Sequence, residues 1–187
     1  MRLIPSSILY ISFALLLSSC EFKCSVGDQG TEPKKTKTVS SSTVEKDGAI
    51  ITNGVDITTK GVKIEKVGLF LPDDSRLSDD NLVSLGEKIK MVILIDSGWV
   101  VEDGKSFIGA SEKISNNLGE VAVKAEDIFS DYTESGIEAA DAKAISLSAV
   151  ITDIGNGGAD HYVVEFRIWD KKGTAEISGS YKFYLKK

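Results

Sequence analysis

The chain has 187 residues, of which 42% are hydrophobic and 27% charged, with 17 Gly, 3 Pro and 2 Cys. This balance is that of a globular protein with one hydrophobic core, and it excludes collagen-like, coiled-coil, disulfide-dense and wholly disordered chains. The formal net charge of −6 makes nucleic acid an unfavourable partner, because an acidic surface repels phosphates.

The first twenty residues have the pattern of a secretory signal. The apolar run over residues 8–17 is too short for a membrane-spanning helix, which needs about twenty apolar residues. The run ends in Leu17-Ser18-Ser19-Cys20, which resembles the lipobox of bacterial lipoprotein signal peptides. The resemblance implies that residues 1–19 form a signal peptide that is removed and that the thiol of Cys20 receives a diacylglyceryl group.

The same resemblance implies a location in the bacterial cell envelope. Each buried methylene contributes about 0.8 kcal/mol, so two or three acyl chains at Cys20 would hold the chain on a membrane. Glu21 stands where an aspartate is associated with inner-membrane retention in Gram-negative lipoproteins, which favours the outer membrane. A plain secretory peptide with a chance cysteine is the alternative. Cys24 is the only other cysteine, and beside a lipidated Cys20 it has no intrachain partner.

Residues 20–47 are expected to form a lipid-anchored flexible tether. They are rich in Ser, Thr, Lys and Gly and contain scarcely any large apolar side chain. A coil of this length spans about 30 Å on average, enough to hold a domain clear of lipid headgroups. The folded domain is therefore assigned to residues 48–187.

From residue 48 onward, apolar residues alternate with polar ones, which is typical of strands with one buried face. Turns are expected at residues 102–105 and 170–173, and the second makes a C-terminal hairpin. Without a long amphipathic helix, the apolar faces must cover one another. The predicted fold class is all-β, an immunoglobulin-like antiparallel β-sandwich of about seven to nine strands. The expected strand segments are residues 49–57, 62–71, 88–96, 106–114, 121–125, 145–154, 162–169 and 175–186.

Residues 126–143 interrupt the alternation. They are expected to carry one or two helical turns that cross from one sheet to the other. The apolar residues expected to anchor this segment to the core are Ile128, Phe129, Tyr132 and Ile137.

The sequence predicts no catalytic residue, metal site or cofactor. His161 is the only histidine, and neither cysteine lies in the folded domain, so structural zinc is excluded. His161 is expected on the face opposite the core, and a Gly-x-Ser-x-Gly elbow, a phosphate-binding loop and a basic stripe with aromatics are all missing from the sequence.

Carboxylates occur in pairs in the expected turns, for example Asp79 with Asp80, and Asp153 with Asp160 around a Gly-rich stretch. Their spacing does not match a calcium-binding EF-hand loop, so solvated turn residues are favoured over a calcium site. Two acids that faced each other across a cleft would instead suit a hydrolase.

Aromatic residues provide the candidate ligand-binding surface. Trp169 and Tyr184 are expected to point outward from the C-terminal hairpin, with Arg167 beside them, and flat aromatic faces suit sugar rings or a partner protein. The alternative is that these rings are shielded by Arg167 and Lys182 or covered by the loop after Glu126. Trp99, at the end of a strand, is expected to pack into the core.

The sequence therefore favours a cell-envelope lipoprotein whose non-catalytic β-sandwich binds or assembles with a protein or a glycan. This hypothesis rests on fold analogy, because sandwiches host many functions. A carboxylate-based envelope hydrolase and a purely structural envelope subunit are the alternatives.

Overall fold

The computed structural model of the chain describes residues 43–153 and 159–186. The lipobox with Cys20, Glu21, Cys24, the signal peptide and most of the expected tether lie outside the described residues, as does the Gly-rich stretch at residues 154–158. Within the described ranges, no helix is long and apolar enough to cross a membrane.

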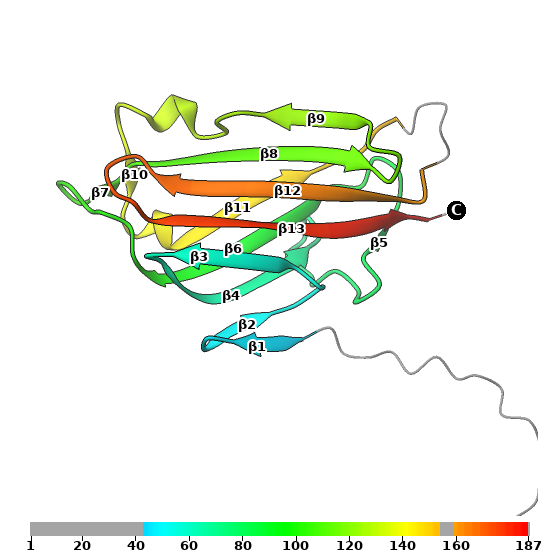
Figure 1. The fold of residues 1–187 in the computed structure, drawn as a ribbon, viewed down its shortest axis with the longest axis horizontal. Helices are drawn as coiled ribbons and strands as arrows, with labels where there is room; N and C mark the ends of the chain where they lie inside the picture. Colours follow the sequence, from blue (N-terminus) through cyan, green and yellow to red (C-terminus); the bar gives the residue numbers. More distant parts are fainter. Residues whose placement is uncertain (1–42, 154–158, 187) are drawn as a thin grey trace, which may run out of the picture. The chain divides into compact units, whose positions relative to one another are not determined.

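Two sheets form the domain (Figure 1). Sheet A has the strand order β1-β2-β4-β6-β11, and sheet B has the order β3-β13-β12-β8-β9, with β5 beside the end of β13. The short strands β7 and β10 pair with each other. The all-β sandwich predicted from the sequence is confirmed. The strands of sheet A are β1 (Val44–Lys46), β2 (Ala49–Ile51), β4 (Lys63–Phe70), β6 (Ile89–Ser97) and β11 (Ala144–Ala149). Those of sheet B are β3 (Asp56–Lys60), β5 (Leu82–Val83), β8 (Ile108–Asn116), β9 (Val121–Ala125), β12 (His161–Asp170) and β13 (Glu176–Leu185), and the remaining pair is β7 (Lys105–Ser106) and β10 (Ile137–Glu138).

The core lies between the inner faces of the two sheets. Alternate residues of each long strand point inward, so that β6 buries four apolar side chains and β12 buries another four. This is the period-two burial that the sequence pattern predicts. The fully enclosed residues of these two strands are Met91, Ile93, Val164 and Ile168.

The predicted turns are confirmed, and the C-terminal hairpin pairs β12 with β13 in continuous register from His161–Tyr184 to Trp169–Glu176. At the first turn, Asp103 and Gly104 have φ values of 50° and 79°, and Glu102 and Lys105 exchange two backbone hydrogen bonds of 2.9 Å. Two positive φ values match the tight hairpin turn that Asp-Gly favours.

One predicted strand is wrong. Residues 49–57 form two strands in different sheets, because Asn53 and Gly54 adopt φ values of 59° and 61° and turn the chain from β2 into β3. The described residues contain thirteen strands rather than seven to nine, because the short strands β1, β5, β7 and β10 also add to the predicted set. The strand predicted over residues 145–154 also ends early, at Ala149.

The chain reversal at Asn53 is held by a buried amide pair. The Nδ2 of Asn53 donates to Oδ1 of Asn81 at 3.0 Å and to the backbone oxygen of Leu77 at 3.0 Å. Its Oδ1 accepts a 3.2 Å hydrogen bond from the N–H of Leu69 in sheet A. The Nδ2 of Asn81 donates to the backbone oxygens of Asn53 and Lys182, both at 2.8 Å, and Lys182 belongs to sheet B. The two amides therefore tie the sheets together at this crossing.

We expect Asn53→Ala to lower the free energy of unfolding by about 2–4 kcal/mol. The substitution leaves several buried backbone groups unpaired and places alanine at a positive φ. Urea denaturation followed by circular dichroism measures the effect. Asn117→Ala, at an exposed position whose amide accepts one hydrogen bond, is the control and should cost less than about 1 kcal/mol. Equal losses in the two variants would contradict a structural role for the buried pair.

Candidate functional site

The aromatic residues singled out in the sequence do not form one surface. Trp169 lies opposite Glu176 in the β12–β13 ladder, whereas Tyr184 lies opposite His161, eight residues further along β13. At about 3.3 Å per residue, the two rings are attached roughly 26 Å apart. Trp169 and Arg167 lie together at one end of the hairpin, and Tyr184 lies at the other.

Trp169 is shielded rather than open. Its ring lies half-buried over Gly109 of β8, where an added Cβ would come within 2.4 Å of the indole. The guanidinium of Arg167 lies 5.2 Å from the ring centroid and also forms a 2.7 Å ion pair with Glu176. This arrangement matches the shielded alternative, in which Arg167 covers the ring.

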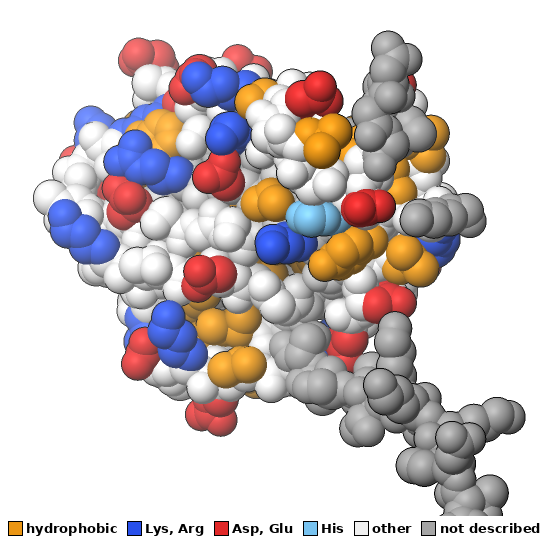
Figure 2. Space-filling view, turned by 45° about the vertical axis from the view of Figure 1, so that its right-hand side comes forward, with side chains coloured by type: hydrophobic (Ala, Val, Ile, Leu, Met, Phe, Trp, Pro, Cys, Tyr) orange, Lys and Arg blue, Asp and Glu red, His pale blue; other side chains and the backbone are white. Residues whose placement is uncertain are grey.

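Tyr184 is 41% exposed, and its ring centroid lies 5.5 Å from that of His161. Figure 2 shows the only histidine, in pale blue, with hydrophobic side chains beside it. His161 faces away from the core, as predicted. Trp99 packs against the core, also as predicted, and its Nε1 donates to the backbone oxygen of Ala142 at 3.2 Å.

Two of the paired carboxylates, Asp73 and Asp80, accept hydrogen bonds within their own turns. Oδ1 of Asp73 accepts hydrogen bonds from the hydroxyl and N–H of Ser75, which lower the pKa of Asp73. Asp80 accepts a 2.6 Å hydrogen bond from the Ser78 hydroxyl, and its pKa is lowered for the same reason. Within residues 43–153 and 159–186, no three His, Cys, Asp or Glu side chains are grouped so that they could hold a metal ion.

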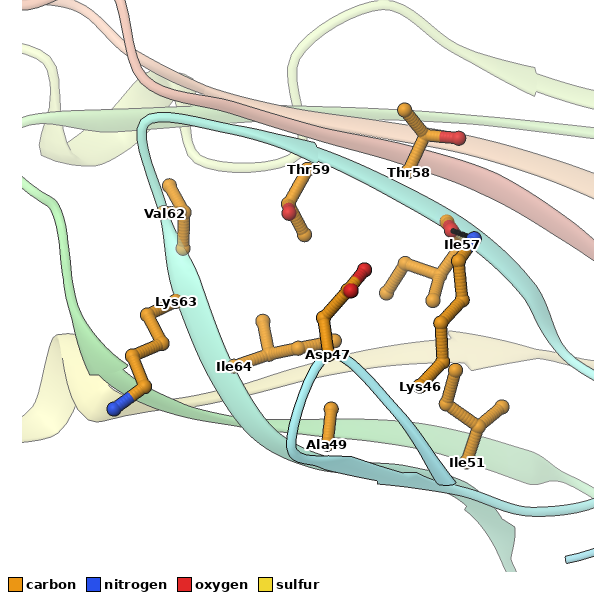
Figure 3. A pocket seen from close by; sticks show the side chains of 10 residues that line it. All are labelled: Lys46, Asp47, Ala49, Ile51, Ile57, Thr58, Thr59, Val62, Lys63 and Ile64. Atoms are coloured by element: carbon orange, nitrogen blue, oxygen red, sulfur yellow. Dashed lines mark hydrogen bonds between the residues drawn. The ribbon is translucent and has the colours of Figure 1, made fainter. Parts of the chain in front are cut away.

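One long side of the sandwich is closed and the other is open. On one side the β1–β2 hairpin covers the gap between the sheets, and Nζ of Lys46 donates to the backbone oxygen of Ile57 in β3 at 3.3 Å. Figure 3 shows the small cavity of about 190 Å³ that remains there, with apolar side chains from β2, β3 and β4 in its lining.

The other side of the sandwich is open. Sheet A ends at β11, whereas sheet B continues past β8 to β9, which forms the upper edge of the front sheet in Figure 1. Val121 and Val123 of β9 are 53% and 39% exposed, although both are large and apolar. We call the space between β8, β9 and β11 the open side.

The larger of two cavities on the open side measures about 410 Å³, and we call it the main cavity, although a hollow of about 670 Å³ lined by Tyr184, Asp79 and Asp80 lies elsewhere on the domain. The size and the apolar lining of the main cavity are those of a ligand pocket. Tyr132, 50% exposed, contributes an aromatic wall, and Nζ of Lys105 forms a 3.3 Å ion pair with Glu138 in the lining. The other lining residues include Ile108, Phe129, Ile137, Asp141, Ala142, Ile145 and Ser146.

The segment at residues 126–143 builds most of this cavity. It contains two 3-10 turns, η1 (Ser130–Tyr132) and η2 (Asp141–Lys143), which confirms the helical turns expected there. Of the four predicted anchors, Phe129 and Ile137 pack against the core, as predicted. Ile128 and Tyr132 are 40% and 50% exposed, so they were wrongly predicted as anchors. The segment folds over the end of the open side, and this leaves part of its apolar surface to line a cavity rather than to join the core.

Asp127 fixes the start of this segment. Its Oδ1 accepts hydrogen bonds from the N–H groups of Ala110 and Phe129 at 3.2 and 3.0 Å, and its Oδ2 lies 2.8 Å from Nζ of Lys171. Burial raises the pKa of Asp127, but these hydrogen bonds outweigh burial and lower the pKa overall. Lys171 also donates to the hydroxyl of Thr133 at 2.7 Å. The cavity wall is therefore attached to both β8 and the C-terminal hairpin.

A second cavity of about 300 Å³ lies at the other end of the open side. Ile108 lines the main cavity and Asn116 lines the second, so the inner face of β8 connects the two. Tyr162 contributes to the lining of the second cavity, and burial together with the charges of Asp153 and Glu120 raises the pKa of its hydroxyl.

Glu112 lies midway between the two cavities on the same face of β8. It is only 6% exposed, and it stands opposite Phe166 on one side and Ala125 on the other. Among the described residues its Oε1 has no hydrogen-bond partner. Burial raises the pKa of Glu112 from 4.5 to about 7. Glu112 is in the lining of neither of these two cavities, but a buried acid with a raised pKa is found often at functional sites.

Glu112 was not singled out from the sequence, although it falls on the same face of the expected strand over residues 106–114 as Ile108, Ala110 and Ile114. An acid at an inward position breaks the apolar alternation. No local pattern predicted the cavities that lie at the two ends of β8.

We expect stability to depend on pH through Glu112. Between pH 4.5 and 7 the folded protein retains a proton that the unfolded chain has released, so the free energy of unfolding falls as the pH rises. Because glutamine cannot ionise, the free energy of unfolding of Glu112→Gln should not fall over this pH range. Above pH 7 the variant should be more stable than wild type by roughly 2 kcal/mol. Urea denaturation at pH 5 and pH 8 measures the difference.

Glu165→Gln, on the exposed outer face of the same sheet, is the control and should keep the wild-type pH dependence. A pH dependence that survives in Glu112→Gln would show that another group causes it.

No protein-family model and no curated protein matches the chain. Among solved structures, the crystal structure of the C-terminal domain of wzt is similar, with a TM-score of 0.45 and 12% sequence identity over 71% of this chain and 78% of that chain.

Proposed function

We propose that this protein is a cell-envelope lipoprotein whose β-sandwich is a non-catalytic binding module, with its ligand, a protein or a glycan, held on the open side. The observation that carries the proposal is the main cavity, which joins an apolar floor to an exposed aromatic wall and a few charged groups. Cys20 would supply the membrane anchor, and the outer membrane is the favoured location.

The composition of the main cavity suits recognition better than catalysis. Ile108, Ile137 and Ile145 provide an apolar surface, and the carboxylate of Glu138 is already paired with Lys105. Phe129 and Tyr132 offer ring faces that suit either a sugar ring or an apolar side chain of a protein. Asp127 holds this wall in place before any ligand arrives, which lowers the entropy cost of binding.

We expect Tyr132→Ala to weaken ligand binding at least tenfold while changing the free energy of unfolding by less than about 0.5 kcal/mol, because the side chain is half exposed. The measurement is a glycan array and an array of peptides from envelope proteins, probed with the full-length lipoprotein in detergent. Tyr184→Ala, at an exposed tyrosine outside the main cavity, is the matched control and should leave binding unchanged. Loss of binding in Tyr184→Ala alone would move the site to the C-terminal hairpin.

We expect Cys20→Ser to release the protein from membrane fractions or to stall removal of the signal peptide, because the serine hydroxyl cannot form the thioether. Incorporation of labelled palmitate and cell fractionation measure the outcome. Cys24→Ser is the matched control and should still be lipidated. Palmitate labelling that persists in Cys20→Ser would overturn the assignment of the anchor.

A further inference from the structure

The edge of sheet A at β11 is unprotected in the part of the chain that the structure describes. Among the described residues β11 pairs with β6 alone, in unbroken register over all six of its residues. Its sequence AISLSA contains no charge and no proline, and its outward residues Ala144, Ser146 and Ser148 are small and exposed. Natural edge strands are usually blunted by a lysine, a proline or a bulge, because their free N–H and C=O groups recruit further strands.

The neighbouring edge of sheet B has these protective features. β9 carries Lys124, and its register against β8 shifts between Ile114 and Ser115. The contrast shows that only one of the two edges on the open side is suited to accept another strand.

Beside β11 the described residues leave apolar surface uncovered and two cavities open. Sheet B extends past the end of sheet A, and Val123 on the inner face of β9 is left 39% exposed. The main cavity begins at Ala144 and Ser146, and the second cavity includes Val150 and Asp153, just after β11 ends. A strand added along β11 would therefore pass both cavities, which are roughly 20 Å apart, or about six residues of extended chain.

The charge of the open side favours a basic ligand. Glu112 lies midway along it with an unpartnered Oε1, and Glu120 and Asp153 contribute to the lining of the second cavity. Asp141 lies in the lining of the main cavity, where the one lysine, Lys105, is paired with Glu138. Acidic groups at the middle and at both ends would attract lysine or arginine and repel acidic chains.

We propose that β11 binds an extended segment of a partner protein as an added strand, with apolar side chains of the segment in the two cavities and a lysine or arginine directed toward Glu112. This inference rests on the proposed function and narrows its ligand to a polypeptide. Backbone hydrogen bonds to β11 supply affinity, and the cavities with Glu112 between them supply specificity.

The test uses the full-length lipoprotein in detergent and fluorescent nonapeptides measured by anisotropy. The parent peptide has leucine at its second and eighth positions, lysine at its fourth and sixth, and threonine elsewhere, so that leucines and lysines share one face. We expect it to bind at least tenfold more tightly than the peptide with glutamate in place of lysine. Hydrogen exchange of the β11 amides should slow when the parent peptide binds.

Two further peptides test the backbone pairing directly. One is N-methylated at the even positions and the other at the odd positions. Alternate N–H groups of a strand point to opposite sides, so one methylated peptide should lose at least tenfold in affinity and the other should bind like the parent. Equal binding of both would overturn strand addition.

Glu112→Gln should reduce the preference for lysine over glutamate at least tenfold, and Glu165→Gln, on the outer face of the same sheet, should leave that preference unchanged. The melting temperature of each variant establishes that it is folded. An unchanged preference in a folded Glu112→Gln variant would overturn the role assigned to Glu112.

The outcomes separate this inference from the proposed function. Binding to glycans but to no peptide would overturn strand addition and leave the binding module intact. Binding to neither array would overturn both. Protection of β11 that rises with protein concentration and needs no peptide would show that the occupant is a second copy of this chain, and it would also overturn the inference.

Discussion

Burial of the inner faces of sheets A and B against each other is the interaction on which the rest of this structure depends. The long central strands β6 and β12 enclose Met91, Ile93, Val164 and Ile168 completely, and their apolar area supplies the main drive to fold. Because each sheet is pleated, the same alternation that buries one face leaves the other face polar. The central strands therefore define the core. How far each sheet extends decides whether each long side of the sandwich is covered or exposed.

The two long sides of the sandwich differ in how completely the gap between the sheets is covered. On one side the β1–β2 hairpin and the Asn53–Asn81 amide pair close the gap with buried, satisfied polar groups. On the other side β9 has no facing strand in sheet A among the described residues, and the segment over residues 126–143 closes only one end. Glu112 lies on this open side, where its burial costs stability at neutral pH. A binding surface needs uncovered apolar area and unpaired polar groups, and both lower the stability of the folded protein. The stability lost by burying Glu112 on the side that holds the two cavities is what such a surface would require.

Much of the fold could be predicted from the sequence, and the site could not. Alternation over residues 162–169 and 175–186 identified the C-terminal hairpin, since the pattern is local and the turn between its strands is short. The alternation over residues 49–57 predicted one strand where there are two, because Asn53 turns the chain while the apolar residues on either side keep the same spacing. The predicted hairpin already separates Trp169, next to the turn, from Tyr184, far from it, but only the packing of Trp169 over Gly109 of β8 shows that its ring is half-buried.

The sequence by itself determined the all-β class and the inward face of each long strand. These features depend on residues two apart in the chain, which the period of a strand brings to the same side. It also contains the only sign of membrane attachment, the lipobox-like residues that end at Cys20, which lie outside the described residues. The tertiary structure alone decided which strands lie at the sheet edges, how far sheet B extends past sheet A and where the main cavity lies. Those properties arise from contacts between residues far apart in the chain, and no local pattern specifies them.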